Sequence, residues 1–407
     1  MAIFHVEPNS PAPERCSLTN TRWQLVPPAD DLPGNIHPAL AQVLAARGIH
    51  SAADMQTFLD APLSSLHDPL LLPDMPAAVA AVQEAIATGG LIRVFGDYDV
   101  DGITATAVLV RALSALGGHV DWYLPHRIDD GYGLNVASLD QAHADGVALG
   151  ITVDNGITAV EQLAHAQAIG LRMIVTDHHE PGDVLPPALA VVDAKRADSV
   201  YPYRELAGVG VAFSLLRAVC DARGIPLHTT AKFLDLVAMG TVADVAPLTG
   251  ENRILVRHGL PLMTPINKKV GLAALLTAVG VRERATCVDV GYQIAPRLNA
   301  AGRVAHASDA LRLLLTSDRA EADTLAAQLC AHNTDRQEEE ARTLDEALTM
   351  VAEHDLTREK ILVLASPNWH PGVIGIVASR LVERFDRPAA LIAVQDGIGK
   401  GSSRARA

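Results

Sequence analysis

The chain has 407 residues, well above the usual size of one domain, so we expect more than one hydrophobic core. Hydrophobic residues make up 49% of the sequence and charged residues 20%, which is a globular composition and excludes a disordered chain. The 47 acidic and 33 basic residues give a formal net charge of -14, which argues against a uniformly basic nucleic-acid coat and against a membrane-surface protein.

Residues 1–90 are predicted to form a helical N-terminal region interrupted by prolines, with an amphipathic helix at Met75–Ala87. The first residues, Met1–Cys16, have no basic head followed by an apolar run, so no signal peptide is predicted. No stretch of about 20 apolar residues occurs, so a membrane-spanning helix is not expected. We therefore expect a cytoplasmic protein that does not contact a membrane.

From Leu91 onward, short β-rich runs alternate with helices, which predicts an α/β fold with a parallel sheet covered on both faces. The predicted strands are Leu91–Phe95, Val147–Val153, Leu171–Val175 and Leu189–Val192. An aspartate follows each of them, namely Asp97, Asp154, Asp177 and Asp193. Because ligands bind outside the carboxyl ends of strands in such sheets, we expect these acids to converge on one crevice.

Helices are expected to follow the sheet, first at Val209–Ala243. The next segment, Glu251–Arg312, carries nine basic and four acidic residues. Its net charge is therefore positive in a chain that is negative overall, and it supplies a local basic patch for a polyanion. Asp318–His354 contains neither Gly nor Pro and predicts one long helix that bridges two domains, with Asn333 as a candidate break. The alternative for this segment is a solvated coiled-coil arm.

A second α/β domain is expected to begin after this helix, with a strand at Lys360–Ala365 and a helix at Gly372–Arg384. The chain stops at Ala407, so we expect the domain to be partial. The cysteines form no C-x-x-C pair, so neither a disulfide framework nor a structural zinc site is expected. They are Cys16, Cys220, Cys287 and Cys330.

The highest concentration of carboxylate side chains lies at Gly96–Gly102, directly after the first predicted strand and before a predicted helix. Its Asp97, Asp99 and Asp101 repel one another unless cations lie between them. The alternative is a calcium-binding EF-hand loop, which D-x-D-x-D-G also opens. That loop needs Glu at its twelfth position, where this chain has Val108, and a helix rather than a strand before it. We therefore favour a metal site at a strand end.

Two more strand ends add candidate ligands. Asp154 follows the second predicted strand, and Asp177-His178-His179 follows the third. Carboxylates with imidazole suit Mn²⁺ or Mg²⁺, whereas zinc more often recruits cysteine or several histidines. Neighbouring histidines at a strand end point in different directions, so we expect one to bind metal and the other to contact substrate. Asp244 ends a long apolar segment and is either a helix-end cap or a further buried ligand.

A site with this many carboxylates can hold two cations about 3.5–4 Å apart, clamp a phosphate and generate hydroxide for in-line attack. Hydrolysis of a phosphoester or phosphoanhydride is therefore the expected reaction class. Other phosphate-binding motifs are missing, since Gly399-Lys400-Gly401 lacks the upstream glycine and the Ser/Thr of a P-loop.

The motifs that identify a family are GDYDVDG (Gly96–Gly102), DGYGL (Asp130–Leu134), TVDNGI (Thr152–Ile157), VTDHHEPGD (Val175–Asp183), LAGVGVAF (Leu206–Phe213), LVAMGTVADVAPL (Leu236–Leu248), APRLNAAGR (Ala295–Arg303) and WHPGVIGIVASR (Trp369–Arg380). Together they resemble the DHH phosphoesterases, named for the motif matched here by Asp177-His178-His179. Within that family they are most similar to the bacterial RecJ-type single-stranded-DNA-specific 5′-to-3′ exonucleases. The resemblance spans about residues 30–404 with the motifs in the family's order.

The resemblance implies a two-metal centre that holds Mn²⁺ or Mg²⁺. The implied ligands are Asp97, Asp99, Asp101, Asp154, His178 and Asp244. Catalytic roles are implied for Asp101 and for His179, which would contact the scissile phosphate or support a metal ligand.

The resemblance also implies groups that hold the DNA. Arg297, Asn299 and Arg303 would bind the backbone, in agreement with the basic segment around them; the alternative is helix-surface charge. The second domain resembles the family's DHHA1 domain. The substrate-facing residues implied there are His370, Ser402 and Arg404.

Two departures from the family pattern bear on function. Many DHH relatives that act on pyrophosphate or short oligonucleotides have His four residues before Asp99, where this chain has Phe95, which favours the exonuclease branch. The family's glycine-rich stretch reads close to GSGRS, whereas Gly401–Ala405 reads GSSRA. The rest of DHHA1 and the family's OB-fold are expected to be missing, and full activity is expected to need them.

The expected domains are an N-terminal helical region (1–90), a DHH catalytic domain (91–250), a basic helical DNA-contacting part (251–317), a long connecting helix (318–358) and a partial DHHA1 domain (359–407). The expected function is a metal-dependent exonuclease that degrades single-stranded DNA from the 5′ end in DNA repair and recombination. A helicase and a single-strand-binding protein are partners implied by the resemblance.

Two alternatives remain. The first is a DHH-type phosphodiesterase of short oligonucleotides or cyclic dinucleotides, which Phe95 and the long basic segment disfavour. The second is a non-catalytic DNA-binding scaffold, which the intact acids and His178 disfavour.

Overall fold

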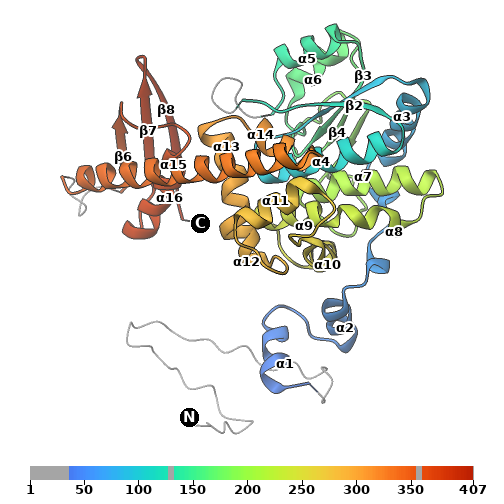
Figure 1. The fold of residues 1–407 in the computed structure, drawn as a ribbon, viewed down its shortest axis with the longest axis horizontal. Coiled ribbons are helices and arrows are strands. Elements are labelled where there is room, and N and C mark those ends of the chain that lie inside the picture. The colour runs from blue at the N-terminus through green and yellow to red at the C-terminus, as the bar shows by residue number, and fades with distance from the viewer. Residues whose placement is uncertain (1–35, 127–132, 354–359, 407) are drawn as a thin grey trace. The chain divides into compact units, whose positions relative to one another are not determined.

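The computed structural model of the chain describes residues 36–126, 133–353 and 360–406 (Figure 1). Two compact units are present, Met1–Ser65 and Leu66–Ala407. The predictions for Met1–Cys16 and for Asp130–Tyr132 of the DGYGL motif lie outside the described residues.

The first unit contains the helices α1 (Pro38–Ala45), α2 (Ala52–Asp60) and the 3₁₀ turn η1 (Leu63–Ser65). The side chain of Ser51 accepts a hydrogen bond from the N–H of Asp54 and so caps the start of α2. Leu44, Ile49 and Met55 form a small buried core between the helices.

The second unit is built on a five-stranded sheet. Its strands are β1 (Leu91–Phe95), β2 (His119–Tyr123), β3 (Val147–Val153), β4 (Met173–Thr176) and β5 (Ala190–Val192). They are parallel and lie in the order β2-β1-β3-β4-β5. The sequence predicted four of these strands and missed β2. As an edge strand, β2 carries His119 and Asp121 and is incompletely buried, so it lacks the continuous apolar run of the inner strands.

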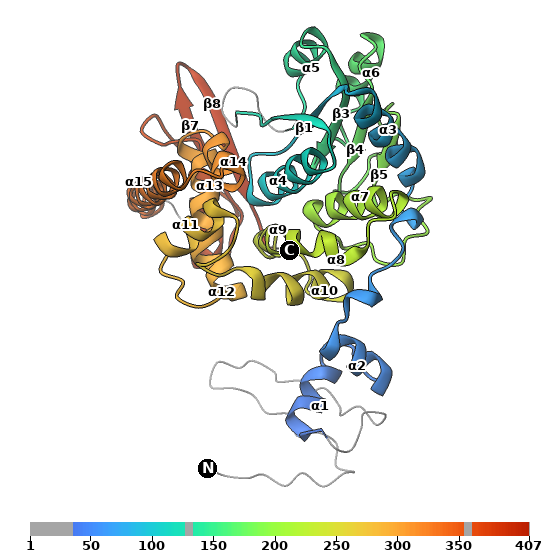
Figure 2. The same cartoon turned by 45° about the vertical axis from the view of Figure 1, so that its right-hand side comes forward.

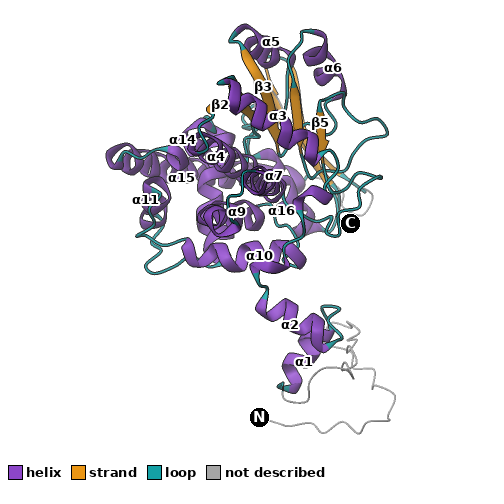
Figure 3. Ribbon diagram, turned by 90° about the vertical axis from the view of Figure 1, so that its right-hand side faces the viewer, coloured by secondary structure: helices purple, strands orange, loops and turns teal. Residues whose placement is uncertain are grey.

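Helices cover both faces of this sheet, as predicted (Figure 3). They are α3 (Met75–Thr88), α4 (Val100–Ala115), α5 (Val136–Ala144), α6 (Val160–Ala168) and α7 (Gly208–Ala222). Leu139 of α5 and Leu163 of α6 share one core with Phe95 and Val175 of the sheet. On the other face lie α3, α4 and α7. Since α3 packs on the sheet, the compact units divide at Ser65 rather than at residue 90.

Helices also fill the middle of the second unit. In chain order they are η2 (Pro69–Leu71), α8 (Leu227–Thr230), η3 (Ala231–Phe233), α9 (Leu234–Ala243), α10 (Gly250–Gly259), η4 (Leu260–Leu262), α11 (Val270–Ala278), α12 (Cys287–Asp289), the π-helix η5 (Val290–Ile294), α13 (Ala295–Val304) and α14 (Ser308–Leu315). The predicted helical region Val209–Ala243 is therefore not continuous. Gly224, with φ of 68°, and Pro226 end the first helix before the next begins.

The long helix α15 (Arg319–Val351) runs without interruption for 33 residues. The break expected near Asn333 is absent, because the side chain of Asn333 accepts a hydrogen bond from Arg336 on the same helix instead of competing for the backbone. One part of α15 packs against α11, α13 and α14 (Figure 2), and its other part against α16 and β6 (Figure 1). The helix therefore connects two packed regions, as predicted, and is not a solvated arm.

A second, smaller sheet follows α15. It consists of β6 (Leu362–Ser366), β7 (Ala389–Gln395) and β8 (Ile398–Arg404), with α16 (Ile374–Phe385) packed on β7 and β8. Trp369, Leu381 and Leu391 lie in its core. The sequence predicted one strand here, and this was incomplete. The pattern of β8, IGKGSSR, has no apolar alternation, and its pairing with β7 depends on the tight turn at Asp396-Gly397, where both residues have positive φ.

None of the described helices is by itself long and apolar enough to cross a membrane, although Leu63–Leu71 and Met75–Thr88 meet the length and composition criteria as a bent pair.

Candidate metal centre and substrate groove

The candidate metal centre lies at the carboxyl ends of the parallel strands. Phe95 of β1 pairs with Thr152 of β3, and Val153 of β3 pairs with Thr176 of β4. The residues that follow these strands therefore emerge at one edge of the sheet. The strand order reverses at β1, which has β2 on one side and β3 on the other. In an open α/β sheet such a reversal opens a crevice for ligands.

Seven side chains gather at this edge, and we call them the acidic cluster: Asp97, Asp99, Asp101, Asp154, His178, His179 and Asp244. They form three overlapping groups whose candidate ligand atoms lie within 4.8 Å of one another: Asp154 with His178 and His179, Asp101 with His178 and Asp244, and Asp97 with Asp99 and Asp154. The structure thus brings together all six residues that the sequence predicted as metal ligands. Their roles remain predictions.

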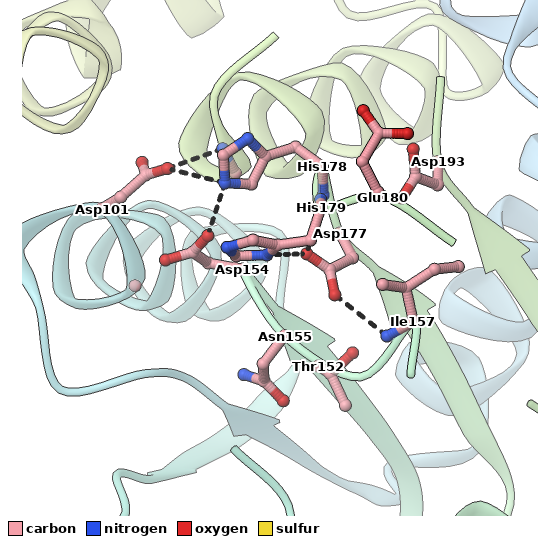
Figure 4. A network of polar contacts seen from close by, with 12 residues as sticks. Asp101, Thr152, Asp154, Asn155, Ile157, Asp177, His178, His179, Glu180 and Asp193 are labelled. Carbon is pink, nitrogen blue, oxygen red and sulfur yellow. Dashed lines mark hydrogen bonds and ion pairs between the residues drawn. The ribbon is translucent and has the colours of Figure 1, made fainter. Parts of the chain in front are cut away.

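His178 belongs to two of the three groups, and Asp154 joins one of these to the third (Figure 4). Its Nε2 lies 3.0 Å from Oδ1 of Asp154 and 3.9 Å from Oδ2 of Asp101, and its Nδ1 lies 3.9 Å from Oδ2 of Asp244. Burial lowers the pKa of His178 to about 4, and the neighbouring His179 adds to this effect. The imidazole is therefore neutral near pH 7, which is the form that binds a metal.

Asp154 is held in an unusual backbone conformation, with φ of 62° and a side chain that is almost fully buried. Gly208 lies directly against it, since a Cβ at Gly208 would stand 2.6 Å from Oδ1 of Asp154. Burial, and then the charges of Asp101 and Asp99, raise the pKa of Asp154 well above its ordinary value. Strained backbone and a perturbed carboxyl in one residue are typical of functional sites.

Asp101 is tied to the start of α7. Its Oδ2 accepts a hydrogen bond of 2.7 Å from the N–H of Gly208, and its Oδ1 accepts one of 3.0 Å from the N–H of Val209. Burial, followed by the charges of Asp244 and Asp99, raises its pKa strongly. Asp101 therefore anchors the positive end of a helix dipole inside the cluster, in addition to any ligand role.

Asp97 and Asp99 bracket the tight turn between β1 and α4. Asp99 caps α4 by accepting a hydrogen bond of 3.1 Å from the N–H of Gly102. A Cβ at Gly102 would lie 2.6 Å from the backbone nitrogen of Asp97, so only glycine lets the helix start this close to the strand end. The spacing of the motif is thus explained by local packing.

Asp177 organises the turn that carries both histidines. Its Oδ1 accepts hydrogen bonds from the N–H of His178 at 2.7 Å and lies 2.8 Å from Nδ1 of His179, while its Oδ2 accepts one from the N–H of Ile157 at 2.9 Å (Figure 4). Burial by itself would raise the pKa of Asp177, but the hydrogen bonds outweigh it and the pKa is lowered. The same contact raises the pKa of His179. The sequence placed Asp177 among the strand-end acids expected to converge, but the family resemblance did not include it among the six metal ligands. Its role in orienting His179 was not predicted.

Two further acids were singled out by the sequence: Asp244, left open between a helix-end cap and a buried ligand, and Asp193, expected to converge with the other strand-end acids. Asp244 is the C-cap residue of α9 and belongs to the group with Asp101 and His178, and its role as a metal ligand remains a prediction. Burial, and then Asp99, raise its pKa to about 6. Asp193 follows β5, is buried, and accepts a hydrogen bond from the N–H of Lys195. Among the described residues, neither Asp193 nor Asp177 joins any of the three groups, so two of the four strand-end aspartates, Asp97 and Asp154, meet there. Asp177 reaches the cluster through its contact with His179.

The acidic cluster fits divalent cations. Several buried carboxylates that raise one another's pKa are destabilised when ionised, and cations between them would remove that repulsion. The donors are carboxylate oxygens and imidazole nitrogens, which suits Mn²⁺ or Mg²⁺.

Two adjoining pockets, which we call the cationic groove, lie among α13, α15, α16 and β8. The larger has a volume of about 430 Å³ and includes Arg303, Lys400, Ser402 and Arg404 in its lining. The smaller, of about 230 Å³, includes Asn299, Arg303 and Arg336. Within the described part of the chain, neither lining contains an acidic residue. The groove is therefore suited to an anion.

The predicted DNA-binding residues divide into two sets. Asn299, Arg303, Ser402 and Arg404 line the groove. Oδ1 of Asn299 accepts a hydrogen bond of 3.2 Å from the N–H of Val100, the first residue of α4, which lies between Asp99 and Asp101. Two residues lie outside the described lining of both pockets. They are Arg297, which donates to the carbonyl of Gln293 at 2.6 Å, and His370, whose Nδ1 accepts from the N–H of Gly372. Sequence reasoning missed Arg336, which belongs to the connecting helix.

The sequence of this chain is similar to a known protein family and to curated proteins of that family. A family model described as the DHH family, N-terminal domain, matches residues 91–241. The single-stranded-DNA-specific exonuclease RecJ of Bacillus subtilis (strain 168) is 40% identical over 393 residues, 94% of this chain and 49% of the relative. That of Escherichia coli (strain K12) is 40% identical over 389 residues, 92% of this chain and 67% of the relative. The chain thus spans about half the length of the first relative and two thirds of the second.

Solved structures give the same result. A crystal structure of exonuclease RecJ bound to manganese matches with a TM-score of 0.76 and 43% identity, covering 85% of this chain and 84% of that chain. RecJ from Thermus thermophilus in complex with Mn²⁺ matches with a TM-score of 0.77 and 40% identity, covering 91% of this chain and 52% of that chain. With its DHH domain, its strand-end acids and this degree of identity over most of its length, the chain belongs to the RecJ family of DHH proteins.

Proposed function

We propose that this chain hydrolyses single-stranded DNA from the 5′ end, in DNA repair and recombination, by a reaction that depends on two Mn²⁺ or Mg²⁺ ions. One observation carries the proposal. Asn299 lines the acid-free groove and is hydrogen-bonded to Val100, which lies between Asp99 and Asp101, so a phosphate chain in the groove would lie beside the acidic cluster. The curated relatives act on single-stranded DNA by name, and the 5′ polarity is supported by the motif resemblance.

We assign the ions to Asp97, Asp99, Asp101, Asp154, His178 and Asp244. When bound, such ions polarise a phosphoryl oxygen and lower the pKa of a bound water so that hydroxide is available near pH 7. RecJ of Thermus thermophilus has been solved in complex with Mn²⁺ and with Mg²⁺, which supports this choice.

The remaining residues position the strand. His179 is oriented by Asp177, which raises its pKa, so its imidazole is suited to donate a hydrogen bond to a non-bridging oxygen of the scissile phosphate. Arg303 and Arg404 offer guanidinium groups, and Ser402 and Asn299 offer neutral donors, to the phosphates that follow. Arg297 and His370 would contribute from the margins of the groove.

Partners and location belong to the same proposal. Unwinding by a helicase generates the single strand that the groove would accept, and a single-strand-binding protein would keep it unpaired. We propose that the protein works in the cytoplasm with both.

The test uses the 407-residue chain with labelled single strands, duplexes, dinucleotides and pyrophosphate, each with Mn²⁺ or with EDTA. We expect Mn²⁺-dependent loss of single strands, with label at the 5′ end released before label at the 3′ end. Preferential cleavage of dinucleotides would instead favour a phosphodiesterase of short substrates. Binding of single strands without any cleavage in Mn²⁺ would favour the non-catalytic scaffold.

A further inference from the structure

The connecting helix α15 passes from α13 to α16 (Figure 1). Along this part it carries a buried charged network. Glu340, with a side chain 3% exposed, forms ion pairs with Arg336 one turn earlier and with Arg380 of α16. Asn333, also buried, accepts a hydrogen bond of 2.9 Å from Nη2 of Arg336. The guanidinium of Arg336 is therefore held from two directions.

Arg336 also forms part of the groove wall. It lines the smaller pocket together with Asn299 and Arg303 of α13, and that pocket also includes Ala243, the residue before the candidate metal ligand Asp244. Arg303 lines both pockets, so the smaller pocket continues the larger one toward the acidic cluster. An anion in the smaller pocket would meet two guanidinium groups and one amide.

A purely structural role explains this network poorly. A buried ion pair adds little net stability, because desolvation offsets the attraction, and apolar residues of similar size often stabilise more. A guanidinium has five N–H donors in a planar fork, and Glu340 and Asn333 engage two of them in contacts that fix the plane of the group. A fixed guanidinium at the edge of an acid-free pocket is suited to bind phosphate in a bidentate manner.

We infer that Arg336 binds a backbone phosphate of the DNA strand next to the acidic cluster, and that Glu340 and Asn333 are positioning residues that hold its guanidinium in place. The inference rests on the proposed function for the identity of the anion. It gives the connecting helix a direct part in substrate binding.

The first test measures binding of a labelled single strand in EDTA, where the strand is not cut, over a range of salt concentrations. Losing one phosphate contact should weaken binding and lower the magnitude of the salt slope by about 0.7 in Arg336→Gln. The matched control is Arg342→Gln, on the same helix, because Arg342 is 67% exposed and pairs with Glu339 on the surface. An unchanged slope in Arg336→Gln, or an equal loss in Arg342→Gln, would overturn the inference.

A second test separates direct contact from a change in packing. Strands that carry one neutral methylphosphonate linkage are scanned from the 5′ end. The wild type should lose affinity at the linkage that Arg336 contacts, and Arg336→Gln should lose nothing further there while keeping its sensitivity elsewhere. If both proteins respond alike at every linkage, Arg336 does not contact the strand.

A double variant covers the risk of misfolding. Arg336→Gln with Glu340→Gln removes both partners, so no unpaired buried charge remains and thermal stability should recover. Binding should stay weak if Arg336 contacts phosphate. Recovery of the wild-type salt slope in the double variant would show that Arg336 acts through packing and would overturn the inference. A wild type that binds strands in this way but never cleaves them would refute the proposed function and leave this phosphate contact standing.

Discussion

The acidic cluster and the cationic groove are built in opposite ways. The cluster uses side chains within three residues of strand ends or helix ends, and backbone N–H groups hold some of them, as that of Gly208 holds Asp101 and that of Gly102 holds Asp99. The groove uses long side chains from α13, α15 and β8, elements far apart in the sequence. The first arrangement holds side chains through backbone hydrogen bonds, and the second gathers positive charge over a wider region. We therefore expect changes in the cluster to act on chemistry by large factors and changes in the groove to act on binding by graded ones.

The largest effect is expected for Asp154→Asn. This change keeps the shape and tolerates the positive φ of Asp154, but removes the carboxylate shared by two of the three ligand groups. Hydrolysis in saturating Mn²⁺ should fall by more than about 100-fold, since even outer partners of metal ligands are worth 10- to 100-fold. The unfolding temperature of the metal-free protein should be unchanged or higher than that of the wild type, because one repulsive charge is lost.

The matched control for this prediction is Asp193→Asn, another buried strand-end acid that lies outside the three described groups. It should retain hydrolysis. Wild-type turnover by Asp154→Asn would show that this carboxylate does not hold a metal.

The next effect concerns the contact between Asp177 and His179. Asp177→Asn weakens the hydrogen bond that orients the ring, so hydrolysis should fall by about 10- to 100-fold. The pKa of His179 should also fall, because the contact with Asp177 is the largest of the effects that raise it, ahead of the charges of Asp244 and Asp101. Titration of the His179 ring by NMR in the metal-free protein would measure this shift.

A surface His–Asp pair provides the control for that variant. His165 lies 2.6 Å from Asp140 on exposed side chains, so Asp140→Asn should leave hydrolysis unchanged. An unaltered His179 titration in Asp177→Asn would show that another group sets the pKa of this ring.

Metal affinity should depend on pH through Asp244. The pKa of Asp244 is raised to about 6, mainly by burial. In the metal-free protein, folding therefore favours the protonated carboxyl, and the contribution of Asp244 to stability is lost as the pH rises through 6. A bound cation reverses the direction of this pH dependence, because it binds the ionised carboxylate of Asp244 and so favours higher pH. Mn²⁺ affinity measured by calorimetry should therefore fall by at least about tenfold between pH 7 and pH 5.

In the same titration His178, with its pKa lowered to about 4, stays neutral and adds little over this range. Asp244→Asn should bind Mn²⁺ more weakly and with a smaller pH dependence. An affinity that does not change with pH in the wild type would remove Asp244 from the ligand set.

The sequence predicted the acidic cluster better than the cationic groove, because the cluster depends on local strand and helix ends and the groove depends on long-range packing. The bounds of β1 and β3 were predicted to the residue, because both are apolar runs bounded by turns, and parallel pairing then brings Asp97 and Asp154 to one edge. The hydrogen bonds to Asp101 from Gly208 and Val209 join residues more than a hundred positions apart. Local pattern contains no information on such contacts.

The groove depends even more on packing at a distance. Arg297 and Arg303 are alike in the sequence, yet one lies off the pocket lining and the other lines both pockets. Arg336 sits in a helix that is polar for most of its length, so its place in a pocket wall follows from how α15 crosses α13 and α16. The second sheet was likewise under-predicted, because β8 is exposed, rich in glycine and defined by its partner strand.

The smallest effect is expected for single arginine substitutions on α13, where the salt dependence of DNA binding is compared between Arg303 and Arg297 variants. Arg303→Gln should lower the magnitude of the salt slope of single-strand binding by about 0.7, since it removes one guanidinium from the wall shared by both pockets. Arg297→Gln should change the slope less, because Arg297 lies outside the described lining of both pockets. Each arginine donates to a backbone carbonyl, Arg297 to that of Gln293 and Arg303 to that of Gly372, so the pocket lining is what distinguishes them. Both variants remove one positive charge from the same helix, so general electrostatic attraction falls equally in the two and the difference reports contact geometry. Equal slopes would mean that α13 presents a diffuse field in which the two arginines are interchangeable, and the groove would then attract the strand without holding individual phosphates.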